Sequence, residues 1–96
     1  MITQHIKVIG RVQSIGYRRW AVDEATKLNL SGWVRNLSDG SVEIMAQGEA
    51  SAVNQFLSAC LKGPMFANVL GIQPVTISHT TPPPIEKGVF KAVASA

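Results

Sequence analysis

The residues best suited to bind a ligand or take part in a reaction lie in the stretch 10–18, which reads GRVQSIGYR. An alternating apolar pattern precedes this stretch and a helical pattern follows it. A short glycine-containing loop between a strand and a helix can direct several backbone N–H groups into one concavity, where the positive end of the helix dipole reinforces them. Arg18 could bind the same anion through two parallel hydrogen bonds, because its guanidinium is planar and permanently charged. An ordinary turn with a solvated arginine fits the local sequence equally well.

A second candidate, Asn36, ends a predicted strand over residues 31–36. Its side-chain amide offers an acceptor oxygen and two N–H donors, so it could hold and orient a water molecule. An asparagine before a turn more often stabilises the local backbone. A functional role is favoured only if the fold brings Asn36 beside Arg18.

Hydrophobic periodicity predicts the elements that would bring these residues together. Alternation of apolar and polar residues indicates strands with one buried face, and spacing of three and four residues indicates helices. The predicted strands and helices occupy residues 3–12 (strand), 19–29 (helix), 31–36 (strand), 41–47 (strand), 50–62 (helix), 68–79 (strand) and 89–93 (strand). Pro74 favours an edge position for the strand within 68–79, and residues 94–96 are expected to fray.

The order β-α-β-β-α-β is typical of an α+β, ferredoxin-like sandwich. Such a fold has a mainly antiparallel sheet, here of four or five strands, with two helices on one face. In this arrangement the first loop lies close to the end of the second strand, so Asn36 is expected near Arg18.

Length and composition limit the possible classes. The 96 residues, of which 46% are hydrophobic and 16% charged, are expected to form one globular domain over 1–96. No apolar run approaches membrane-spanning length, and residues 1–5 do not resemble a secretory signal, so no membrane association is expected. The single cysteine, Cys60, cannot form an internal disulfide, which favours a cytoplasmic protein. The net charge of +3 comes from scattered residues, which suits a small anionic ligand better than nucleic acid.

Other reactive residue types are expected to be structural. Cys60 falls on the apolar stripe of the helix over 50–62, which indicates a core position. His5 and His79 show no ligand spacing, so no metal site is predicted. An RNA-binding domain of this topology would need exposed aromatic residues on its central strands, and residues 41–47 contain none.

Together with residues 32–36, GWVRN, and 39–42, DGSV, the stretch 10–18 resembles the acylphosphatase family in motif order and spacing. The resemblance implies a ferredoxin-like fold and hydrolysis of the carboxyl–phosphate bond of small acyl phosphates, with no cofactor and no metal. It implies that Arg18 binds the phosphoryl group and that Asn36 orients the attacking water. The implied phosphate-binding loop consists of Gln13, Ser14, Ile15, Gly16 and Tyr17. A monomer is expected, with inorganic phosphate or sulfate as a competing anion.

The chain departs from the usual family pattern at three loop positions. The family usually has glycine, valine and phenylalanine where this chain has Ser14, Ile15 and Tyr17. Ser14 is the largest departure, because a Cβ atom opposes the left-handed backbone conformation that glycine adopts freely. A catalytically weakened anion-binding or regulatory domain is therefore the alternative to an active enzyme.

Overall fold

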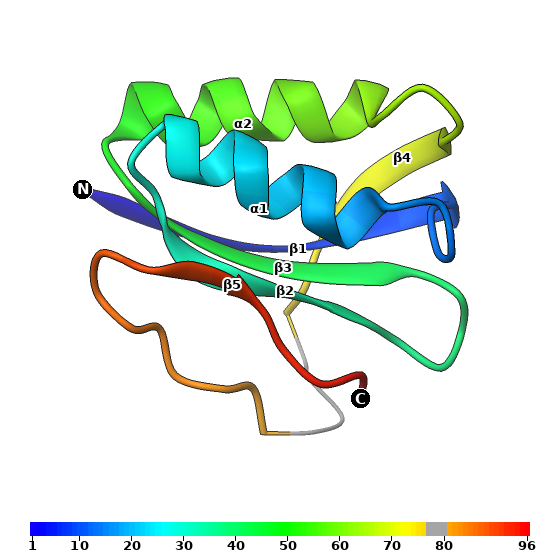
Figure 1. The fold of residues 1–96 in the computed structure, drawn as a ribbon. Coiled ribbons are helices and arrows are strands. Elements are labelled where there is room, and N and C mark those ends of the chain that lie inside the picture. The colour runs from blue at the N-terminus through cyan, green and yellow to red at the C-terminus, as the bar shows by residue number, and fades with distance from the viewer. Residues whose placement is uncertain (77–80) are drawn as a thin grey trace.

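Two helices cover one face of a five-stranded sheet in the computed structural model, which describes residues 1–76 and 81–96 (Figure 1). The elements are β1 (Ile2–Arg11), α1 (Tyr17–Lys27), β2 (Ser31–Asn36), β3 (Val42–Gly48), α2 (Ala50–Lys62), β4 (Asn68–Pro74) and β5 (Phe90–Ala92). The predicted ferredoxin-like α+β class is confirmed.

The sheet has the strand order β4-β1-β3-β2-β5. β1 pairs antiparallel with both β3 and β4, and β2 pairs antiparallel with β3. β5 alone runs parallel to its neighbour, β2. β4 lies at an edge, as Pro74 predicts, because a proline cannot donate a hydrogen bond to a further strand.

The core lies between the sheet and the helices. Ile6, Val8 and Val12 are buried there, as the alternation predicts. Ala21 and Ala25 of α1 are fully buried, and α2 contributes Val53, Phe56 and Cys60. Leu61, which its spacing also assigns to the apolar stripe, is 48% exposed. It lies about 100° around the helix from Cys60 and therefore at the margin of the buried face.

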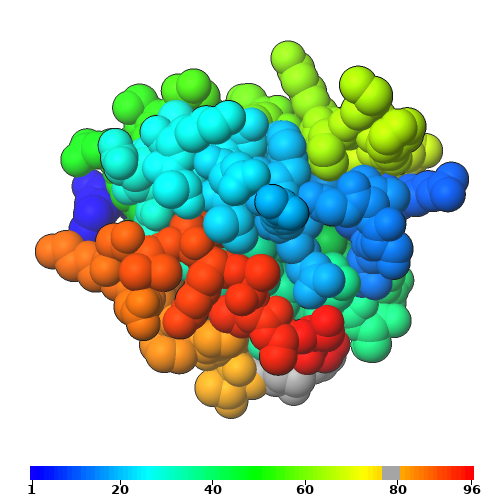
Figure 2. Space-filling model, viewed as in Figure 1, coloured from blue at the N-terminus to red at the C-terminus, as the bar shows by residue number. Residues whose placement is uncertain are grey.

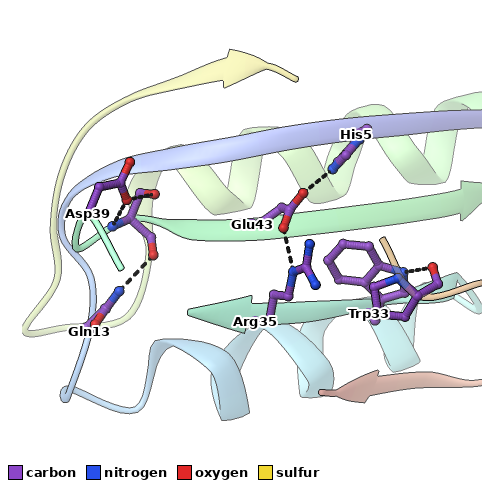
Figure 3. A network of polar contacts seen from close by, with 8 residues as sticks. His5, Gln13, Trp33, Arg35, Asp39 and Glu43 are labelled. Atoms are coloured by element: carbon purple, nitrogen blue, oxygen red, sulfur yellow. Dashed lines mark hydrogen bonds and ion pairs between the residues drawn. The ribbon is translucent and has the colours of Figure 1, made fainter. Parts of the chain in front are cut away.

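The opposite face of the sheet carries a buried polar network instead of a second apolar core (Figure 3). Glu43 lies 2.5 Å from both Arg35 Nε and His5 Nε2. The Arg35 guanidinium stacks over the ring of Trp33, at 4.9 Å from its centroid. Trp33 is fully buried and donates a hydrogen bond to Pro83 O at 2.9 Å. The segment around Pro83 thus covers β2 on the side away from the helices.

Several element boundaries, and the contacts of the C-terminal residues, differ from the sequence-based predictions. α1 begins at Tyr17, two residues early, because the buried Tyr17 side chain anchors its first turn. The chain after β5 does not fray: Ala96 N–H donates to Asn36 O at 3.0 Å. β4 ends at Pro74, and the predicted continuation through Ile77 and His79 lies outside the described residues.

No helix in the described part of the chain is long and apolar enough to cross a membrane.

Candidate active site

The loop between β1 and α1 contains two residues with left-handed backbone conformations. Ser14 has φ 62°, and Gly16, the N-cap of α1, has φ 82° and ψ 14°. Left-handed residues within such a loop turn neighbouring N–H groups toward one side and form an anion-binding concavity. The positive φ that Ser14 is expected to need for a phosphate-binding loop is therefore observed.

The N-terminus of α1 is suited to an anion. In the described structure no side chain caps it, and its first turn contains no acidic residue. The first N–H groups of a helix have no partner within the helix, and the helix dipole makes this end positive. Anions bind readily at such a position.

A cavity of about 560 Å³ opens beside this helix end. Ser14, Gly16, Arg18 and Asn36 all line it, although Asn36 lies at the end of β2. The fold thus brings the two motifs predicted from the sequence into one cavity. Figure 2 shows two of the segments that line it, with α1 in blue to cyan next to the C-terminal segment in red, which includes β5.

Three cationic side chains line the cavity, from Arg18, Arg19 and Lys91. None of its described lining residues is an aspartate, glutamate or histidine. Lys91 Nζ also lies 3.6 Å from Glu86 Oε1, in a pair that is largely exposed and hence weak. The cavity is electropositive and provides no general base of its own.

Asn36 carries an unusual polar atom. Its Oδ1 is buried and accepts no hydrogen bond within the described residues. Leaving a buried acceptor without a partner costs about 1–3 kcal/mol, and the large majority of such atoms in folded proteins are satisfied. Asn36 therefore combines a place in the cavity lining with an acceptor oxygen that has no partner among the described residues.

The predicted loop residues play different parts. Ser14, Gly16 and Tyr17 line the cavity, whereas Gln13 and Ile15 are not among its lining residues. Ile15 packs against the core as a partly buried residue. The Gln13 side chain extends to the turn between β2 and β3 (Figure 3), where Nε2 donates to Leu37 O and to Ser41 O, each at 2.8 Å.

The Tyr17 side chain points into the core. It is 1% exposed, and its hydroxyl donates to Cys60 O at 2.7 Å. Burial, followed by the proximity of Cys60, raises the pKa of Tyr17 far above its ordinary value. The hydroxyl therefore stays protonated and ties α1 to α2 rather than taking part in acid–base chemistry.

Apart from Val12, which lies within the stretch 10–18, the cavity is completed by five residues that sequence reasoning missed: Arg19, Val22, Phe90, Lys91 and Ala92. Three of them come from β5, whose parallel pairing with β2 places it beside the site. No local motif marks these residues. The only available signal was the topology, since a last strand that joins β2 at the edge must lie next to Asn36.

Within the described residues no group of three or more histidine, cysteine, aspartate or glutamate side chains could hold a metal ion. His5 is engaged with Glu43 on the other face of the sheet, and His79 lies outside the described residues. Cys60 is fully buried in the core, as predicted.

The fold and the site define a class: small α+β sandwiches whose first helix begins beside an electropositive cavity. The family model for acylphosphatase matches residues 4–87. An acylphosphatase of Alcanivorax borkumensis is 54% identical over 69 residues, covering 72% of this chain and 75% of the relative. An acylphosphatase of Acidiphilium cryptum is 43% identical over 91 residues, covering 95% of this chain and 96% of the relative.

A crystal structure of acylphosphatase from Bacillus subtilis superposes with a TM-score of 0.80. The two chains are 34% identical, and the match covers 97% of this chain and 99% of the other. The chain therefore belongs to the acylphosphatase family. The predicted enzyme class, a hydrolase acting on acyl phosphates, is confirmed by this membership.

Proposed function

We propose that the protein hydrolyses the carboxyl–phosphate bond of small acyl phosphates, with Arg18 and the loop 13–17 binding the phosphoryl group and Asn36 orienting the attacking water. The observation that carries this proposal is the cavity that Arg18 and Asn36 both line, together with the unpartnered Oδ1 of Asn36. The acylphosphatase name of the relatives supports the same reaction.

The reaction needs positioning more than strong acid–base catalysis. Water attacks phosphorus, the bond between phosphorus and the acyl oxygen breaks, and the electron pair leaves with the carboxylate. The carboxylate is a good leaving group, and the proton of the attacking water passes to an oxygen of the substrate itself. Catalysis then depends on holding the reactants in line and stabilising the charge on the equatorial oxygens.

Each part of the cavity has a role in this scheme. Arg18 and the N–H groups of the loop and of the first turn of α1 bind the equatorial oxygens. Asn36 Oδ1 accepts a hydrogen bond from the water and fixes it opposite the leaving group. Because an oriented water is needed only in the chemical step, Asn36 contributes to turnover and little to phosphate affinity.

Turnover of benzoyl phosphate by the two site variants tests these roles. Asn36→Ala should lower kcat by about 100-fold or more, as loss of other single positioning contacts does, while phosphate affinity stays within about threefold. Arg18→Ala should abolish the thermal stabilisation that phosphate or sulfate gives to the folded protein by mass action.

Matched controls come from the same sheet. Asn68 lies on the edge strand β4 and Arg11 at the end of β1, and both are exposed. Asn68→Ala and Arg11→Ala should retain wild-type turnover and phosphate binding. Equal losses of turnover and affinity in Asn36→Ala would make Asn36 a support for the loop rather than a catalytic residue.

The alternative, a weakened anion-binding domain, rests on Ser14 with its left-handed backbone. It predicts phosphate-dependent stabilisation without turnover of any acyl phosphate. Turnover that persists in chelator and that phosphate inhibits competitively would exclude it.

A further inference from the structure

The Gln13 side chain joins the phosphate loop to the strand end that carries Asn36. Its Nε2 donates at 2.8 Å to Leu37 O, the carbonyl of the residue after Asn36, and at 2.8 Å to Ser41 O. These two carbonyls stand at opposite ends of the β2–β3 turn, so one amide group holds both ends.

The two carbonyls do not depend on Gln13 for a partner. Leu37 O also accepts from Gly40 N at 3.2 Å, and Ser41 O from Leu37 N at 2.9 Å. Losing Gln13 would therefore leave no bare carbonyl, and the usual large penalty for an unpaired buried group would not arise. What the side chain adds is the connection between the loop and the turn.

The β2–β3 turn, to which Gln13 is bound, is itself held in place by several polar contacts. Asp39 Oδ1 accepts hydrogen bonds from Ser41 N at 2.9 Å and from Ser41 Oγ at 2.5 Å. Asp39 also forms an ion pair with Lys7 of β1. The turn is thus tied to β1 from one side and to the loop through Gln13 from the other.

We propose that Gln13 is a positioning residue that acts through Asn36. By fixing the loop against Leu37, it sets the position of the bound phosphoryl group relative to the amide of Asn36. This inference rests on the proposed function, because it assigns Gln13 a role in the same reaction. It predicts that Gln13 affects the chemical step more than phosphate binding, since the loop N–H groups and Arg18 bind phosphate whether or not Asn36 is aligned.

A double-mutant cycle tests the coupling, because two residues that act as a unit show strongly non-additive effects. Gln13→Met keeps the length of the side chain and removes both N–H donors. We expect kcat for benzoyl phosphate to fall by about tenfold or more, which is the scale of a small misplacement of reacting groups. In an Asn36→Ala background, assayed at raised enzyme concentration, the same change should alter kcat by less than about twofold.

Gln47→Met is the matched control. Gln47 also donates through Nε2, to Thr3 Oγ1 at 2.8 Å, but in an exposed pair far along the sheet from the turn. It should leave kcat unchanged in both backgrounds. Gln13→Asn, whose shorter amide cannot reach both carbonyls, is the second variant and should show the same non-additivity.

The outcomes separate this inference from the proposed function. A wild-type protein without turnover refutes the proposed function itself. Given turnover, equal losses from Gln13→Met with and without Asn36, or a large loss of phosphate affinity, refute the positioning role. An activity-independent readout is the NMR signal of the Asn36 side-chain amide, which should shift or broaden in Gln13→Met and not in Gln47→Met; an unchanged signal overturns the inference.

Discussion

Replacement of Ser14 by glycine should relieve strain that the loop now holds. Ser14 has φ 62°, a conformation in which the Cβ of an L-residue costs about 1–2 kcal/mol. Glycine removes this cost but gains about 0.4–1 kcal/mol of conformational entropy in the unfolded chain. Because Ser14 is exposed, little packing is lost. The two contributions differ by about 0–1.6 kcal/mol, and the middle of this range is a net stabilisation of about 0.5–1 kcal/mol.

Two further variants test the strain argument, one in which little strain is relieved and one in which strain is introduced. Asn29 has nearly the same φ, 58°, but asparagine tolerates this region, so Asn29→Gly should leave stability nearly unchanged. Gly16 has φ 82°, and a Cβ built there would meet nothing within 4 Å. Gly16→Ala should therefore cost about 1–2 kcal/mol through the backbone alone and should weaken phosphate binding.

Urea and thermal unfolding in phosphate-free buffer measure these effects. A gain of 0.5–1 kcal/mol corresponds to a rise in Tm of roughly 2–8 °C for a domain of this size. Phosphate titration of the same variants should show an equal or tighter Kd for Ser14→Gly. A Ser14→Gly protein that is less stable than wild type and binds phosphate no better would refute the strain argument. It would also remove the reason for suspecting a weakened enzyme.

Three other perturbations test the support of the site. Tyr17→Phe removes the 2.7 Å hydrogen bond to Cys60 O and should destabilise the protein by about 1–3 kcal/mol in urea unfolding, because a buried carbonyl loses its donor; unchanged stability would contradict this. Burial raises the pKa of Cys60 to about 12, so an aromatic disulfide reagent should react with the thiol only after unfolding; fast labelling of the native protein would show otherwise. Hydrogen bonds from Lys7 and then Ser41 hold the pKa of Asp39 far below its ordinary value. Their stabilisation is present above the ordinary aspartate pKa of about 4 and is lost as pH falls below it, so urea unfolding of Asp39→Asn should show a shallower loss of stability on acidification than wild type.

The sequence was most informative where a periodic pattern coincided with a clear stop signal. The helix predicted over 50–62 is observed as Ala50–Lys62, because Gly63-Pro64 ends it and its apolar stripe has no competing interpretation. The first helix was predicted to start at residue 19, yet Tyr17 extends the stripe of Ala21 and Ala25 by one turn. Tyr17 was assigned to the loop because it belongs to the motif with two glycines, although its spacing from Ala21 and Ala25 already indicated a buried position on the helix.

The burial of both faces of β2 could not be predicted from the local sequence pattern. Ser31 through Arg35 are all buried, although a sheet with helices on one side predicts alternation. The cover on the second face comes from a segment about fifty residues later, through the contact of Trp33 with Pro83. Such a contact depends on tertiary topology, as does the pairing of β5 with β2 that brings Lys91 to the cavity.

The loop keeps its strained backbone conformation because the packing of the residues on either side of it contributes more free energy than the strain at Ser14 costs. Val12 and Tyr17 flank the loop and are each 1% exposed, and burial of one such side chain contributes about 1.5–3 kcal/mol. The burial of both side chains together therefore exceeds the cost of about 1–2 kcal/mol for a left-handed Ser14. With both ends fixed in the core and Gln13 bound to the β2–β3 turn, few backbone paths remain for the residues between them. The backbone of a loop held in this way is set before any ligand arrives, and this preorganisation is what the proposed reaction, which depends on positioning, requires.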